Sequence, residues 1–269
     1  MRLIAMLSAL ALALAPLPVL AANQTITAYQ PSGQEAQDQA VVIKAMQAGS
    51  LQAIKAFEPE LAAVLKHAPA QYPQIEQRGD LTIIRSISGQ GGMSGALLMS
   101  ALNNKSGKSK TTATAFNIYP MAALLLGSLA NERRDPRAAI AVLDKGLALQ
   151  PDNLMLITEK GAALGVLKRF SDALDLYQSA DKIDFVTKML DPGGEARLLR
   201  GKGFVLIELN RLDEAQAAYE AALKLEPNHA GAKGELDYIR KLRAGGDQRA
   251  IGLVPGDKAK NGEPAPAKP

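Results

Sequence analysis

Hydrophobic and polar positions alternate with a helical period between residues 197 and 227, RLLRGKGFVLIELNRLDEAQAAYEAALKLEP. Apolar residues three and four positions apart lie on one face of a helix, and this stretch contains two such runs. The polar pair that begins at Asn210 separates them. Gly203 and Ala215 are small where two helices must cross closely, and Pro227 ends the second run. The pattern predicts two amphipathic helices joined by a tight turn.

Two similar helix pairs precede this one. The step from Gly127 to Gly161 and the step from Ala139 to Ala173 are both 34 residues. The step from Gly161 to Gly203 is 42 residues, so eight additional residues lie before the third pair. We place them in the segment FVTKMLDPGGE. Since one helix pair cannot cover its own apolar face, the pairs are expected to stack on one another.

The 34-residue period, with Leu126-Gly127 followed by Ala, a bulky residue and Pro in order, resembles the tetratricopeptide repeat (TPR). The resemblance covers residues 119–243. It departs from the family at the usual Trp of the first helix, where this chain has Ala123, Ile157 and Leu199. It implies a mostly α fold in which three TPR-like helix-turn-helix repeats form a right-handed α-solenoid. The alternative is an ordinary helical bundle whose spacing arises by chance.

The last predicted helix covers residues 230–243, AGAKGELDYIRKLR. Leu236, Ile239 and Leu242 share one side of it and charged residues share the other. An amphipathic helix at this place suits a capping helix over the third repeat. The remaining residues, 244–269, contain too few apolar side chains to order a chain and are predicted to be a disordered tail.

Residues 23–118 predict a small α+β region. Ser32 and Glu35 form a candidate capping box for a helix that runs to about residue 48, and Pro59 divides a second helical stretch. Residues 81–88 are rich in β-branched side chains, and residues 111–117 alternate in polarity, so we expect these two strands to pair. The glycines of residues 89–95 predict a break before a short helix at 96–103.

The amino-terminal 22 residues are typical of a secretory signal peptide. Arg2 precedes the apolar run of residues 3–14, and the segment ends PLPVLAA. A membrane anchor is the alternative, but the run is shorter than the roughly 20 apolar residues that span a bilayer. We expect export to the periplasm, with secretion as the alternative, and no integral membrane span. The chain contains no cysteine, so neither disulfides nor a lipid anchor on cysteine is expected.

The net charge of +4 and the pI of about 9.2 raise the question of a nucleic-acid partner. Residues 119–243 contain 18 basic and 18 acidic residues, and the excess elsewhere is spread out. Nucleic-acid binding requires a clustered basic face, so we exclude this class.

Cofactor and metal motifs are incomplete. GQGGMSG has Ser94 where the dinucleotide motif requires its third glycine, and LNNKSGKS has Leu102 where the phosphate loop requires its first. His67 and His229 lack a second ligand at metal-binding spacing, and we expect both to be solvated. We therefore predict no catalytic residue, no cofactor and no metal.

The resemblance places a binding surface on the concave side of the solenoid, which the first helix of each pair lines. The concave positions are Met121, Leu124, Ser128 and Asn131 in the first copy, Met155, Thr158 and Ala162 in the second, and Arg197, Arg200, Phe204, Ile207 and Glu208 in the third. They form a mildly apolar trough with a basic end. An extended peptide with apolar side chains and a carboxylate at the basic end suits this trough.

Two observations and one alternative bear on the hypothesis that the trough binds a peptide. Carboxylate-clamp members of the family have Lys and Asn where this chain has Leu124 and Ser128, so the resemblance does not extend to that clamp. Arg197 and Arg200 have Asp191 and Glu195 in the preceding loop as alternative partners. In a further alternative, the amino-terminal segment packs into the trough and closes it.

Two functions remain open. The first is a non-catalytic scaffold or assembly factor of the bacterial cell envelope, which binds a partner peptide or protein through the concave TPR face. The second is an enzyme or small-ligand-binding protein with its site in residues 78–117 and repeats used for docking. Clustering of Arg85, Ser88, Ser94 and Lys108 in one pocket would favour the second function.

Overall fold

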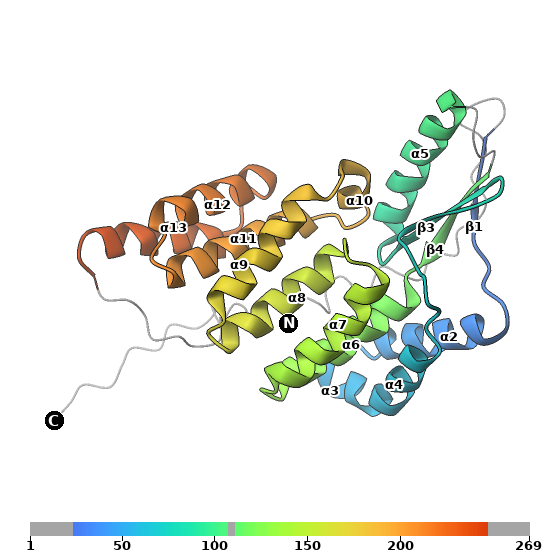
Figure 1. Cartoon of the computed structure of the whole chain (residues 1–269), viewed down its shortest axis with the longest axis horizontal. Coiled ribbons are helices and arrows are strands. Elements are labelled where there is room, and N and C mark those ends of the chain that lie inside the picture. Colours follow the sequence, from blue (N-terminus) through green and yellow to red (C-terminus); the bar gives the residue numbers. More distant parts are fainter. Residues whose placement is uncertain (1–23, 107–110, 247–269) are drawn as a thin grey trace.

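The computed structural model describes residues 24–106 and 111–246 (Figure 1). The predicted signal peptide, Lys108 and most of the predicted tail lie outside these residues. Within them, no helix combines the length and the apolar content that crossing a bilayer requires.

Within the described residues, three helix pairs and a last helix make up the carboxy-terminal part of the fold. They are α6 (Ile118–Glu132) with α7 (Pro136–Leu149), α8 (Leu154–Val166) with α9 (Phe170–Ser179), α11 (Gly194–Glu208) with α12 (Leu212–Leu225), and α13 (Ala230–Arg243). Consecutive helices pack against each other, and the pairs follow one another across Figure 1. The predicted order of three TPR-like repeats and a capping helix is confirmed.

Each pair closes through the same backbone turn. Arg134, Lys168 and Asn210 have φ angles of 60°, 58° and 57°, which are uncommon for residues other than glycine. They follow one another at the 34-residue and 42-residue steps of the sequence (134 to 168, 168 to 210). In the third turn the amide of Arg211 donates to the carbonyl of Leu206 at 2.8 Å. The predicted turn after the first helix is therefore confirmed.

The longer second step contains an additional short helix. A 3₁₀ helix, η3 (Ala180–Lys182), and then α10 (Phe185–Met189) separate α9 from α11. Helix α10 lies in the segment 185–195, in which the sequence places the eight additional residues, and η3 lies just before it. In Figure 1, α10 lies between the repeats and α5, and it contacts α5 (Gly89–Ser106).

A mixed sheet of four strands forms the far end of the described part of the molecule. Its strands are β1 (Thr25–Ala28), β2 (Ile75–Arg78), β3 (Leu81–Ser86) and β4 (Thr111–Phe116), in the order β1-β4-β3-β2. Both β1 and β3 run parallel to β4, and β2 is antiparallel to β3. The predicted pairing of residues 81–88 with 111–117 is confirmed, with Ile83 opposite Ala113. Strands β1 and β2 are not among the predicted strands.

The predicted break at residues 89–95 is wrong, because α5 begins at Gly89 and contains these glycines. Ser88 caps the helix by accepting a hydrogen bond from the Gly91 amide at 2.9 Å. A Cβ on Gly91 would lie 2.3 Å from the backbone oxygen of Leu190, and a Cβ on Gly95 would lie 2.3 Å from its side chain. These glycines are required for close packing against the residue that follows α10.

Three short helical segments follow β1. They are α2 (Gly33–Gln47), α3 (Leu51–Ile54) with the 3₁₀ helix η2 (Lys55–Phe57), and α4 (Glu58–Lys66). Pro59 lies in the first turn of α4, as the predicted division implies. Ser32 precedes α2, but its side chain makes no capping hydrogen bond, and Glu35 accepts one from the Tyr29 hydroxyl at 3.1 Å. The predicted capping box is therefore wrong, although the helix start is correct.

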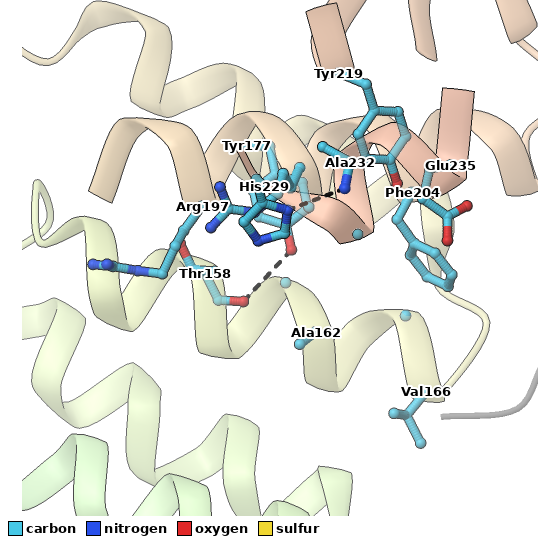
Figure 2. A pocket seen from close by; sticks show the side chains of 15 residues that line it. Thr158, Ala162, Val166, Tyr177, Arg197, Phe204, Tyr219, His229, Ala232 and Glu235 are labelled. Carbon is cyan, nitrogen blue, oxygen red and sulfur yellow. Dashed lines mark hydrogen bonds between the residues drawn. The ribbon is translucent and has the colours of Figure 1, made fainter. Parts of the chain in front are cut away.

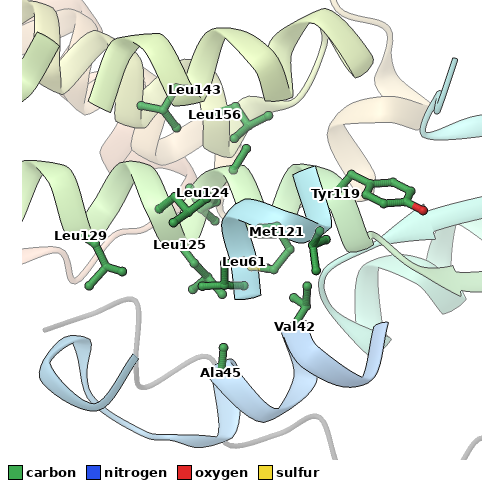
Figure 3. Packing of buried hydrophobic residues seen from close by; sticks show 14 of the residues in the cluster. Val42, Ala45, Leu61, Tyr119, Met121, Leu124, Leu125, Leu129, Leu143 and Leu156 are labelled. Atoms are coloured by element: carbon green, nitrogen blue, oxygen red, sulfur yellow. The ribbon is translucent and has the colours of Figure 1, made fainter. Parts of the chain in front are cut away.

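The amino-terminal helices cover one side of α6. Every residue from Ile118 to Ala130 is buried. Figure 3 shows Leu61 beside Leu125 and Val42 beneath Met121, and these side chains belong to one hydrophobic cluster with Leu124. A second cluster extends from α8 to α13, and a third, smaller one joins the sheet, α5 and Leu190. The first repeat is therefore packed between the amino-terminal helices and the second repeat.

Candidate functional site

A cavity of about 500 Å³ opens between the second repeat, the third repeat and the capping helix. We call it the groove (Figure 2). Its walls come from α8, α11 and the first turns of α13, and Tyr177 and Tyr219 reach it from α9 and α12. The lining residues are Thr158, Gly161, Ala162, Gly165, Val166, Tyr177, Arg197, Arg200, Gly201, Phe204, Tyr219, His229, Gly231, Ala232 and Glu235.

Tyr177 forms the floor of the groove. Its ring lies against Gly161 of α8 and Gly201 of α11, because a Cβ at these positions would approach the ring or its hydroxyl to 2.3 and 2.6 Å. The hydroxyl donates to the carbonyl of Thr158 at 3.5 Å. Burial raises the pKa of the Tyr177 phenol, so it stays neutral at physiological pH. The small residues and this ring keep the floor uncharged.

The basic end of the groove is an ion pair. Arg197 Nη2 lies 2.6 Å from both carboxylate oxygens of Asp191, and Pro192 separates Asp191 from the Gly193-Gly194 start of α11. Burial raises the pKa of the Asp191 carboxyl, and the positive charge of Arg197 opposes that rise. The alternative pairing of Arg197 with Asp191 is confirmed.

The second arginine has a different partner from the predicted one. Arg200 Nη1 lies 2.5 Å from Glu226 Oε2, at the carboxyl end of α12. Glu195 instead accepts a hydrogen bond from Lys188 Nζ at 3.0 Å. The proposed Arg200–Glu195 pair is wrong, because the α11–α12 hairpin returns Glu226 to the start of α11.

The capping helix contributes one wall of the groove through its first turns. His229 is the N-cap of α13, and its Nδ1 accepts a hydrogen bond from the Ala232 amide at 3.0 Å. The imidazole thereby positions Ala232 and Glu235 over the groove (Figure 2). His229 is half-buried, whereas the sequence predicts a solvated side chain without this capping role.

Five of the predicted binding residues line the groove. They are Thr158, Ala162, Arg197, Arg200 and Phe204. They come from α8 and α11, the first helices of the second and third repeats. The structure brings them together around the floor formed by Tyr177.

The other predicted binding residues lie elsewhere. Met121, Leu124, Ser128 and Ile207 are buried, with 3, 2, 8 and 2% of their surface exposed. Asn131 donates to Glu159 at 3.5 Å, Met155 packs against the first hydrophobic cluster, and Glu208 is half-buried near the end of α11. In the described structure the open part of the concave side is therefore formed by the second and third repeats.

Several lining residues were not among those predicted. Tyr177 and Tyr219 occupy the bulky position of their repeats, which the sequence assigns to packing between helices. Val166 lies one turn beyond Ala162 on α8. Ala232 and Glu235 come from the helix that the sequence identifies as a cap. The resemblance supplies concave positions on first helices alone, so it could not indicate a wall formed by the capping helix.

The residues of the rival site in 78–117 do not line this groove. Arg85 is fully buried, 4.0 Å from the centre of the Tyr72 ring, and pairs with Glu76 at 2.5 Å. Ser88 caps α5. Ser94 lies in α5, and Lys108 is outside the described residues.

The His67 side chain is 41% exposed, as expected of a solvated histidine, and it also contacts a buried carboxylate. Its Nδ1 lies 2.9 Å from Asp38 Oδ1, and Asp38 accepts a further hydrogen bond from the Tyr119 hydroxyl at 3.4 Å. This cluster joins α2, α4 and α6 and is part of the packing between them. In residues 24–106 and 111–246, no group of three or more His, Cys, Asp and Glu side chains is arranged to hold a metal ion.

The fold and the groove define a class: an array of helix pairs with an open groove, closed by a capping helix. The family model of the tetratricopeptide repeat matches residues 196–229, which cover most of α11 and all of α12. The chain contains a tetratricopeptide repeat at these residues, and the two preceding helix pairs resemble it.

Solved structures have a similar arrangement of helices. The pilF protein of Pseudomonas aeruginosa is 16% identical, with a TM-score of 0.51 over 79% of this chain and 72% of that chain. The first TPR domain of human RPAP3 is 28% identical, with a TM-score of 0.40 over 47% of this chain and 95% of that chain. The Arabidopsis OM64 TPR domain is 21% identical, with a TM-score of 0.40 over 46 and 95%. The comparison with curated proteins found no match.

Proposed function

We propose that the protein is a non-catalytic interaction scaffold of the bacterial cell envelope, and that the groove binds a segment of a partner protein. The observation that carries the proposal is an open cavity of about 500 Å³ on the concave side of a repeat array. This volume lies within the range of about 300 to 1,000 Å³ that is typical of ligand pockets. The apolar run of residues 3–14 supports export to the envelope.

The shape of the groove favours a peptide segment. Phe204, Val166 and Ala162 offer apolar contacts along its length, and 41% of the surface of Val166 is exposed. Burial of such side chains by a guest contributes about 25 cal/mol for each Å² removed from water. Because the amino-terminal helices cover α6, a guest segment occupies the second and third repeats and the wall formed by α13.

A photo-crosslinking experiment tests this function. A crosslinking amino acid at Val166, in the full-length protein expressed in its host, should capture a partner in the envelope fraction. The variant Val166→Asp should lower co-purification of the same partner by about tenfold or more, because a buried carboxylate opposes an apolar contact.

Leu225→Asp is the matched control. Leu225 is also exposed, by 52%, but it lies at the end of α12 and does not line the groove. This variant should retain the partner. Equal loss with both variants, or capture in the cytosol alone, would contradict the proposal.

A further inference from the structure

The groove has two cationic side chains, and the chain itself neutralises both. Arg197 contacts both oxygens of Asp191 at 2.6 Å, and Arg200 contacts Glu226 at 2.5 Å. The side chains of Arg197 and Asp191 are only 22 and 10% exposed, so water and salt screen this pair weakly. A guest carboxylate would have to displace a carboxylate that is already in place.

Asp191 is held in position by its neighbour in the chain. Leu190 is 1% exposed and packs between α5 and the sheet, in a socket that Gly91 and Gly95 leave open. Ser86 Oγ donates to the Leu190 carbonyl at 2.8 Å. The backbone that carries Asp191 is thereby fastened to the amino-terminal sheet, which holds the Asp191 carboxylate within reach of Arg197.

The two carboxylates converge on the start of α11. A Cβ on Gly194 would lie 2.5 Å from Asp191 Oδ2, and a Cβ on Gly193 would lie 3.2 Å from Glu226 Oε1. The amino terminus of a helix stabilises negative charge, and Arg197 follows within the first turn. The two glycines therefore leave room for two anions beside the two arginines.

We infer that Asp191 and Glu226 determine the specificity of the groove, restricting it to uncharged, apolar peptide segments and excluding acidic ones. The inference rests on the proposed function. With both arginines neutralised, the apolar surface of Ala162, Val166 and Phe204 remains to attract a guest, and the Glu235 carboxylate adds negative charge that opposes an acidic one. An acidic guest would lose its hydration near the existing carboxylates and gain no free cation in return.

Selection from random decapeptides displayed on phage tests the inference on the full-length protein. The wild type should select apolar peptides without charged residues. The double variant Asp191→Asn/Glu226→Gln keeps the shape of both side chains and removes the negative charge that each places against its arginine. It should select peptides rich in Asp and Glu, and it should bind a synthetic acidic decapeptide about tenfold more tightly than the wild type does.

The double variant Asp213→Asn/Glu214→Gln is the charge-matched control. Both residues are on α12, their side chains are 97 and 55% exposed, and neither lines the groove. The control changes the net charge equally, so it should select the same peptides as the wild type. Selection of acidic or basic peptides by the wild type, or identical selections by the two double variants, would overturn the inference.

Failure of the proposed function has a different signature. If the groove binds no peptide, Val166→Asp would not weaken the binding of any selected peptide. The inference would then be contradicted together with the proposed function. If the selected peptides depend on Val166, but the wild type and the Asp191→Asn/Glu226→Gln variant select equally acidic peptides, the inference is contradicted and the proposed function is not.

Discussion

At the scale of single residues, each repeat is closed by a glycine on the first helix and a large side chain on the second. A Cβ would lie 2.7 Å from the partner side chain in the first and third repeats and 2.3 Å away in the second. The pairs are Gly127 with Leu143, Gly161 with Tyr177, and Gly203 with Tyr219. Tyr177 also contacts Gly201 of the following repeat, so one ring fixes the spacing of three helices.

Gly161→Ala should therefore destabilise the protein although alanine favours helices. The added Cβ would lie 2.3 Å from a ring that is 2% exposed and has little room to move. We expect the free energy of unfolding to fall by about 1–3 kcal/mol in urea denaturation. Gly234→Ala, in α13 with no atom within 4 Å of its Cβ, should instead raise it by about 0.5–1 kcal/mol. A stabilising Gly161→Ala would show that the ring is not fixed.

Side-chain pairing was predictable from the sequence where the partners are close along the chain. Arg197 and Asp191 are six residues apart, and this pair was among the alternatives. Arg200 and Glu226 are 26 residues apart and meet because the α11–α12 hairpin folds back. The His67–Asp38 contact joins residues 29 apart in the same way. Local sequence does not contain this information, because it depends on how two helices pack.

At the scale of elements, the sequence predicts repeats better than it predicts the amino-terminal region. The helix pairs have long periodic patterns, which mark both their faces and their turns. β1 and β2 have four residues each, and β2, IEQR, has a single apolar residue. The sequence predicts the helix at residues 96–103 but a break at 89–95, where α5 already runs, because each glycine costs a helix about 1 kcal/mol relative to alanine. Packing against Leu190 requires those glycines, so tertiary contact overrides the local preference.

A double-mutant cycle tests the socket around Leu190. Leu190→Ala should cost about 2–4 kcal/mol of unfolding free energy, because it leaves a cavity between α5 and the sheet. Gly95→Ala should cost about 1–3 kcal/mol in the wild type, since its Cβ would lie 2.3 Å from Leu190 Cδ2. In the Leu190→Ala background this atom is absent, so most of the cost should disappear.

Gly91→Ala supplies the contrast within the same helix. Its Cβ would meet the Leu190 backbone oxygen at 2.3 Å, which Leu190→Ala does not remove. Its cost, measured by urea denaturation, should persist in both backgrounds. Equal rescue of both glycine variants would mean that α5 shifts as a whole and that the socket is not specific.

At the scale of the whole molecule, the helices form two large hydrophobic clusters. One joins the amino-terminal helices to α6 and α7, and the other joins α8 to α13. The sequence predicts the second cluster, since the repeat positions identify it. The first depends on α2 and α4 covering α6, and their periodicity does not indicate the face that they cover. Helix arrays derive their stability from contacts between neighbours, so the two clusters need not unfold together.

Hydrogen exchange of the full-length protein tests this separation. Leu61→Ala removes a fully buried side chain of α4, and Ile239→Ala removes one of α13 that is 1% exposed. Each should cost about 2–5 kcal/mol locally. Leu61→Ala should lower amide protection in α4, α6 and α7, and Ile239→Ala should lower it in α12 and α13, because opening spreads first through shared contacts. Each variant serves as the control for the other. If both variants lower protection evenly along the described chain, the molecule unfolds as one cooperative unit. The helices around the groove could then not unfold locally without loss of the amino-terminal packing.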